Sequence, residues 1–203
     1  TTGYIPGFED GAVAIKVLAP IEYDVEGGPG LRSLGGKTSG QNTNGHSVML
    51  RVDYGRTRTL LTGDLNKTAQ QLLLEAYAGK RLEFAADIAK ACHHGSDDVS
   101  MAFLQAISAS ATIISSGDAE GHDHPRPQIV AASGATGHLK IEDDEIVTPL
   151  VYSTEIARSY SIGNLTHIEL DGGNTLAGNA LSKTKLHYEE TKAGDLMPRK
   201  RYR

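Results

Sequence analysis

Hydrophobic and polar positions alternate over the first third of the chain. Residues 11–18 form an apolar, β-branched run that is typical of a strand. Residues 58–61 form a second such run, joined through a hairpin-like connection at 54–56 to a strand that precedes it. That preceding strand has one buried face, as predicted by the alternation of Val48, Leu50 and Val52 with Met49, Arg51 and Asp53.

Further along, the apolar period changes to three and four. Residues 69–77 place alanines, leucines and a tyrosine on one helical face, with Asn66 as the N-cap and Gly79 as the stop. The pattern then predicts a buried strand, a helix that begins at Ser100, a strand, a helix that begins near Pro125 and Pro127, and a last strand. These elements cover 85–92, 100–107, 112–115, 125–132 and 150–154 in turn.

Two stretches lack this periodicity. Residues 24–45 are rich in Gly, Ser, Thr and Asn and predict a long, flexible loop. The final fifty residues suggest one or two β-hairpins. With 203 residues, of which 39% are hydrophobic, the chain suits a single domain over 1–203 with a real core. Alternating strands and helices predict an α/β layered architecture.

Charge and cysteine content narrow the possible classes of protein. The net charge of −5 argues against general polyanion binding. The basic tail at 196–203 is expected to be a solvated terminus, with a phosphate-contacting arm as the alternative. No apolar run approaches the roughly twenty residues that span a membrane. The lone Cys92 excludes an internal disulfide and fits a reducing compartment, which favours the cytoplasm.

Two of the expected strands end in groups that bind metal ions. Residues 60–64 finish with the carboxylate of Asp64, and residues 91–96 hold the adjacent imidazoles of His93 and His94. Imidazole suits zinc, manganese or iron, and a carboxylate bridges two such ions. Either motif alone is common in turns, because Asp and Gly both favour them. Two strands of one sheet that end side by side would bring Asp64 and His94 together. In this order and at this spacing, the two motifs indicate a metallohydrolase site.

These motifs also carry a resemblance to a known family. Four segments resemble the metallo-β-lactamase superfamily, and most of all the β-lactamase-like domain of competence DNA-internalisation proteins and its stand-alone relatives. The resemblance covers residues 10–155 and implies an αββα sandwich, or part of one. The segments are Asn44 through Val52, Leu60 to Asp64, Asp87 through Ser96, and His124-Pro125.

The resemblance implies roles for five side chains. Asp64 corresponds to the carboxylate that bridges two divalent metal ions, and His94 to the last histidine ligand, with His93 as a second candidate ligand or an orienting group. His124 is expected to protonate a leaving group or to stabilise negative charge. Ser96 is expected to donate to a phosphate or to be a turn hydroxyl. Zinc is the expected metal, with manganese or iron as alternatives.

The superfamily's main metal-binding signature, His-x-His-x-Asp-His, does not occur in this sequence. The chain is therefore expected to be the C-terminal portion of the fold, with its first half missing or on another polypeptide; a degenerate protein is the alternative. The resemblance implies a metal-dependent hydrolase that uses metal-generated hydroxide on a phosphodiester. The alternative is an incomplete half-fold that binds a partner. We expect the isolated chain to bind metal weakly, to catalyse little, and to associate with a partner or with itself.

Overall fold

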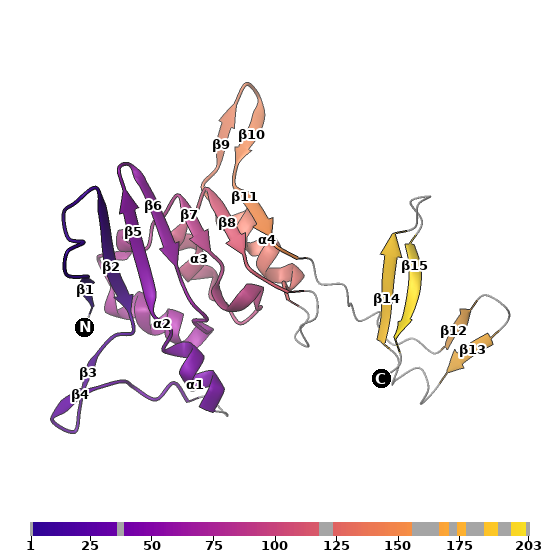
Figure 1. Ribbon diagram of the computed structural model, residues 1–203, viewed down its shortest axis with the longest axis horizontal. Helices are drawn as coiled ribbons and strands as arrows, with labels where there is room; N and C mark the ends of the chain where they lie inside the picture. Colours follow the sequence, from indigo (N-terminus) through magenta and orange to yellow (C-terminus); the bar gives the residue numbers. More distant parts are fainter. Residues whose placement is uncertain are drawn as a thin grey trace.

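A computed structural model describes residues 2–35, 39–117 and 124–155, together with the backbone of four strands within 167–201. Within this part, a seven-stranded sheet has helices on one face (Figure 1). Its strands, in spatial order, are β1 (Gly3–Tyr4), β2 (Val13–Ala19), β5 (Met49–Tyr54), β6 (Thr57–Leu61), β7 (Ile88–Lys90), β8 (Ala111–Ile114) and β11 (Leu150–Ser153). The protein is therefore a mixed α/β structure.

The direction of the strands changes at β6. The strands from β1 to β6 pair antiparallel, whereas β6, β7, β8 and β11 pair parallel. Parallel neighbours need crossover connections, which are usually helical. Here α2 (Lys67–Ala76) connects β6 to β7, α3 (Met101–Ile107) connects β7 to β8, and α4 (Pro127–Thr136) lies between β8 and β11. The carboxyl ends of β6, β7 and β8 therefore share one edge of the sheet.

Local sequence signals account for the helix starts. Asn66 precedes α2 in an extended conformation, and its Oδ1 accepts a hydrogen bond from the Ala69 amide at 3.0 Å, as an N-cap should. Ser100 is the N-cap residue of α3 by position, although its hydroxyl makes no capping bond. Pro127 occupies the first turn of α4, where a missing amide hydrogen costs nothing.

The main core lies between the sheet and these helices. Phe84 and Phe103 are both fully buried, with ring centroids 5.4 Å apart, and Tyr77 stacks on Phe84 at 4.9 Å. The sheet contributes Leu18, Leu60 and Ala89 to the same cluster. No helix in the described ranges is long and apolar enough to cross a membrane.

The segment 24–45 is more ordered than its composition predicts. It overlaps a small hairpin, β3 (Tyr23–Val25) with β4 (Gly28–Gly30), and it contains the short helix α1 (Ser39–Gly45). Side-chain-to-backbone bonds account for part of this order, because Asp24 Oδ1 accepts from the Gly27 amide and Asn42 Oδ1 from the Leu34 amide. Such bonds leave no hydrophobic period, so the expectation of one continuous loop is corrected.

Six further strands form three hairpins outside the main sheet. An acidic turn at 142–145 connects β9 (Lys140–Glu142) to β10 (Glu145–Thr148). Two more hairpins, in keeping with the sequence, are β12 (His167–Leu170) with β13 (Asn174–Ala177), and β14 (Lys185–Glu190) with β15 (Leu196–Arg201). The backbone of the basic tail up to Arg201 is therefore a paired strand and not a frayed end, and the side chains there lie outside the described residues.

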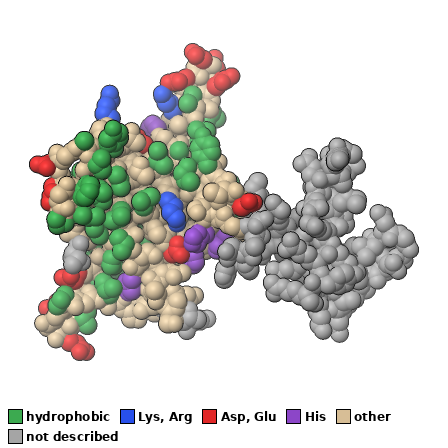
Figure 2. Space-filling view, in the orientation of Figure 1, with side chains coloured by type: hydrophobic (Ala, Val, Ile, Leu, Met, Phe, Trp, Pro, Cys, Tyr) green, Lys and Arg blue, Asp and Glu red, His purple; other side chains and the backbone are tan. Residues whose placement is uncertain are grey.

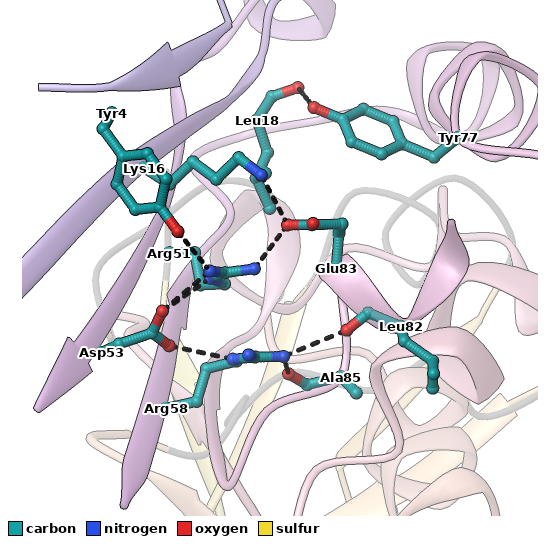
Figure 3. Close-up of polar contacts among 10 residues, drawn as sticks. All are labelled: Tyr4, Lys16, Leu18, Arg51, Asp53, Arg58, Tyr77, Leu82, Glu83 and Ala85. Carbon is teal, nitrogen blue, oxygen red and sulfur yellow. Dashed lines mark hydrogen bonds and ion pairs between the residues drawn. The ribbon is translucent and has the colours of Figure 1, made fainter. Parts of the chain in front are cut away.

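The alternation in β5 is confirmed, but the buried face is the opposite of the one that hydrophobicity favours. Met49 and Arg51 are buried against the helices, whereas Val48 just before the strand is exposed. Arg51 is accommodated because it meets carboxylates: it forms ion pairs with Asp53 at 2.8 Å and with Glu83 of the 3-10 helix η1 (Arg81–Glu83). Figure 3 shows the contacts of Arg51 with Asp53 and Glu83.

The ion network continues to both sides of Arg51. Lys16 Nζ donates to Glu83 at 2.9 Å, and Arg58 Nε donates to Asp53 at 2.9 Å (Figure 3). Arg58 also donates to the carbonyl oxygens of Leu82 and Ala85. Burial alone would raise the pKa of Glu83, but the hydrogen bond from Lys16 and the charges of the neighbouring cations lower it overall. The network thus fastens η1 to three strands.

The other face of the sheet, which we call the open face, carries the complementary residues. Strand register places these residues in continuous rows, because Cα partners in neighbouring strands share a face. None of them is buried, and Figure 2 shows apolar side chains gathered over this side of the sheet. They are Val13, Ile15, Val17, Leu50, Val52, Tyr54, Thr57, Thr59, Leu61, Ile88, Lys90, Ala111, Ile113, Leu150 and Tyr152.

Candidate metal site at the strand ends

Asp64 and His94 lie at the shared carboxyl edge of the parallel strands. Asp64 follows β6, and His94 follows β7 in the 3-10 segment η2 (Cys92–Gly95). Since β6 and β7 are parallel neighbours, both chains leave the sheet on the same side. Ligands of open α/β sheets bind outside the carboxyl ends of strands. The sequence prediction that these two side chains come together is confirmed.

Asp64 and His94 form a close pair that solvent can reach. His94 Nε2 lies 3.5 Å from Asp64 Oδ1. The other ring nitrogen, Nδ1, is 2.8 Å from the Ser115 carbonyl oxygen, which only accepts, so Nδ1 carries the proton. Nε2 therefore has its lone pair free when the ring is neutral. Backbone carbonyls orient metal-binding histidines in this way. The His94 side chain is half exposed, so the pair is reachable from solvent.

The backbone before Asp64 is fixed by a close contact. Gly63 has φ +57, and a Cβ there would lie 2.6 Å from Ser47 Cβ. The absence of that Cβ lets the Ser47 hydroxyl approach and accept the Asp64 amide hydrogen at 3.0 Å. The Gly63 carbonyl in turn accepts from the His93 amide at 3.1 Å. These bonds join the two strand ends and set the position of the carboxylate.

The two histidines have an unusual backbone conformation. His93 has φ 46 and His94 has φ 53, both in the left-handed region, and Gly95 follows at φ 88. For residues with a Cβ, this conformation costs roughly 1–2 kcal/mol each. A Cβ on Gly95 would lie 2.7 Å from Pro125 Cβ and 2.8 Å from Ile114 Cγ2, so the turn is closely packed. Such strain is concentrated at functional sites.

The structure separates the roles of the adjacent histidines. His93 turns away from Asp64: its Nε2 is 3.4 Å from Asn44 Nδ2, and its ring centroid is 5.8 Å from that of His124. Its Nδ1 is buried and has no hydrogen-bond partner among the described residues. His94 Nε2 instead lies 3.5 Å from Asp64 Oδ1. Of the two histidines, His94 is therefore the one that contacts the carboxylate.

Ser96 and Cys92 both occupy buried positions beside the site. The Ser96 hydroxyl accepts a hydrogen bond from the Asp98 amide at 3.2 Å, which is the contact of a turn hydroxyl. Burial raises the pKa of the Cys92 thiol to about 11, so it stays protonated and is a poor nucleophile near neutral pH. Cys92 thus packs as a small apolar residue in the main core.

The chemistry of Asp64 and His94 fits a divalent metal ion, but their number falls short. A carboxylate oxygen and an imidazole nitrogen suit zinc, manganese or iron. The ranges 2–35, 39–117 and 124–155 hold no cluster of three or more His, Cys, Asp or Glu side chains able to hold a metal ion. Catalytic zinc generally takes three protein ligands. The described residues alone therefore offer too few ligands for a catalytic zinc site.

Two contributors to this site were not identified from the sequence. Lys90, the last residue of β7, brings its ammonium to 4.0 Å from Asp64 Oδ1. Ser115 contributes only a carbonyl oxygen, which no side-chain motif reveals. The signal for Lys90 was present, because Lys90 and Asp87 are the two charged residues within the predicted buried strand 85–92.

Comparison with known proteins gives a limited likeness. The chain is 36% identical over 83 residues to the competence protein ComA of Neisseria gonorrhoeae. That segment covers 40% of this chain and 12% of the relative, so the chain spans only a small part of that protein. No family model matches the chain, and no solved structure matches it. The chain is thus a partial homologue of a competence protein.

Proposed function

We propose that the chain forms the C-terminal portion of a metal-dependent hydrolase with the αββα architecture of the metallo-β-lactamase superfamily. The observation that carries the proposal is the Asp64–His94 pair, 3.5 Å apart, with His94 oriented by a backbone carbonyl at the carboxyl ends of parallel strands. The likeness to a competence protein agrees with the branch that the sequence motifs resemble.

In the complete fold, Asp64 and His94 would hold divalent metal, with zinc favoured over manganese and iron. When bound, such metal lowers the pKa of water so that hydroxide is available near neutral pH. Ser115 fixes the proton of His94 on Nδ1 and keeps Nε2 available as a ligand. We assign to His124, whose ring centroid is 5.8 Å from that of His93, the donation of a proton to a leaving group or the stabilisation of negative charge. The proposed substrate is a phosphodiester.

The open face supports the idea of a second layer. Apolar residues cover it from β2 to β11, and none is buried. Sheets pack face to face through such rows of inward-pointing side chains. We propose that a second sheet, from another segment or another chain, covers this face and adds the ligands that the described residues lack.

The proposal is tested in the longest natural form of the protein. Asp64→Ala and His94→Ala should each lower hydrolysis of bis(p-nitrophenyl) phosphate by more than about a hundredfold, since losing a group that only orients a ligand costs roughly 10- to 100-fold. Bound metal, measured by mass spectrometry, should fall in parallel. His138→Ala is the matched control, because His138 is exposed and distant from these strand ends. Full activity and full metal content in both site variants would refute the proposal.

The same open face favours a second candidate function, a non-catalytic module that binds a partner chain through this surface. The two candidates differ in metal content. A protein that binds its partner tightly, yet takes up no metal and hydrolyses no phosphodiester in the complex, would be such a module. Parallel loss of metal and activity in the Asp64 and His94 variants would exclude it.

A further inference from the structure

Lys90 is the only charged residue among the described open-face rows. It ends β7 opposite Ile113 of β8, so its aliphatic stem lies among apolar neighbours. Lysine commonly covers apolar surface with its stem and directs its ammonium to a polar edge. Here the ammonium is directed to the carboxyl edge of the sheet, where Asp64 and His94 stand.

The ammonium is held there by oxygen atoms. Lys90 Nζ donates to the Gly63 carbonyl at 3.2 Å and to the Ala91 carbonyl at 3.1 Å, and Asp64 Oδ1 is 4.0 Å away. Carbonyl and carboxylate oxygens are also the groups that bind a hard metal cation, so the ammonium occupies a cation-like position. The Lys90 side chain is 25% exposed, so solvent only partly screens this charge. Asp64 therefore has a fixed positive neighbour.

A metal ion at the Asp64–His94 pair would share the same carboxylate oxygen. Both His94 Nε2 and Lys90 Nζ approach Asp64 Oδ1, at 3.5 Å and 4.0 Å. A divalent cation bound there would thus lie close to the ammonium and be repelled by it. Two charges roughly 4 Å apart change the metal-binding constant by about tenfold even when water screens their interaction strongly.

We propose that Lys90 is a resident counter-cation of Asp64 that opposes metal uptake by the incomplete site. The inference rests on the proposed function, because it takes Asp64 and His94 to be metal ligands. With two ligands, the repulsion keeps metal binding weak. Firm binding then requires the additional ligands of the second layer, so the site is loaded only in the assembled protein. Lys90 acts on metal binding through its charge beside Asp64 and is not itself a ligand.

The test compares metal affinity in this chain, by titration against a chromophoric zinc chelator at low ionic strength. Lys90→Met removes the charge but keeps the stem, and should tighten zinc binding by about tenfold or more. Lys90→Arg keeps the charge and should match the parent chain. Lys80→Met is the control, because Lys80 is an exposed lysine next to η1, away from the carboxyl edge. Adding Asp64→Asn to Lys90→Met should abolish the gain.

Three results of this design would overturn the proposal. Equal or weaker zinc binding by Lys90→Met, including no detectable binding by either form, would overturn the role of Lys90. If zinc still bound in that case, and substitution of Asp64 or His94 weakened the binding, the proposed function would stand. If Asp64→Asn left zinc binding unchanged both in the parent chain and in Lys90→Met, the metal site itself would be overturned, and with it the proposed function. A gain from Lys80→Met equal to that from Lys90→Met would show a general charge effect and also overturn the proposal.

Discussion

The two faces of the seven-stranded sheet are built from the same strands but differ in what covers them. On the helix side, β2, β5 and β6 present Lys16, Arg51, Asp53 and Arg58, which are neutralised by one another and by Glu83. On the open face, the alternate residues of the same strands carry no charge and, apart from Thr57 and Thr59, are apolar; none is buried. The charged residues are thus covered and the apolar ones are not.

This difference teaches that the burial of charged residues on these strands follows the available partners and not hydrophobicity. Arg51 is only 6% exposed because η1 brings Glu83 to it and because Asp53 lies on the same strand. Soluble proteins rarely leave a large continuous apolar surface uncovered unless it binds something. The open face therefore has the composition of a core face, and the described residues leave it uncovered.

The sharpest test of the comparison is to remove one aromatic ring from each side. Phe84→Ala should cost about 3–5 kcal/mol of unfolding free energy, because Phe84 is fully buried between Tyr77 and Phe103. Tyr54→Ala on the open face, where Tyr54 is 65% exposed, should change it by less than about 0.5 kcal/mol. Urea denaturation followed by circular dichroism measures both. Similar losses would show that the open face is already covered in this chain.

A smaller effect is expected from the ion network. Glu83→Gln should destabilise the chain by about 1–3 kcal/mol at pH 7, because Arg51 is left buried with one carboxylate partner fewer. Glu75→Gln, at an exposed position of α2, is the matched control and should be nearly neutral.

The pH dependence of this difference follows from the lowered pKa of Glu83. A carboxyl group with a depressed folded pKa contributes stability above its usual value of 4.5, and this contribution is lost as the pH falls through the lowered value. The gap between the parent chain and Glu83→Gln should therefore be full at pH 7 and shrink at pH values below 4.5. A gap that stays constant down to acid unfolding would show that Glu83 acts through packing and not through charge.

Elements and strand ends could be predicted from the sequence because their signals are local. The period of two placed β5, and the spacing of leucines with Asn66 placed α2. The closeness of Asp64 and His94 followed from the expectation that neighbouring strands end at one edge. Which face of β5 is buried could not be predicted, because it depends on where η1 and the helices pack.

Residue type and spacing alone did not decide which of the two histidines faces the carboxylate, although the resemblance favoured His94. His93 and His94 are adjacent and chemically identical, and only the left-handed backbone of η2 and the Ser115 carbonyl distinguish them. These are tertiary features, set by contacts between residues far apart in the chain. The ion pairs of Arg51 were hidden for the same reason, since Glu83 is separated from it by the whole of α2.

The smallest effect on stability, and the most informative one for function, is expected from charges placed on the open face. The pair Tyr54→Lys and Tyr152→Lys should leave unfolding free energy within about 0.5 kcal/mol of the parent, because both side chains are more than half exposed. Self-association, measured by sedimentation velocity across a concentration series, should decrease, since the paired lysines would repel a covering apolar layer. Arg56→Ala and Glu75→Gln, changed together at exposed positions outside the open face, control for surface change in general. If the parent chain self-associated strongly and the lysine pair left this association unchanged, the contact surface would lie elsewhere. That result would contradict the proposal that a second layer covers the open face.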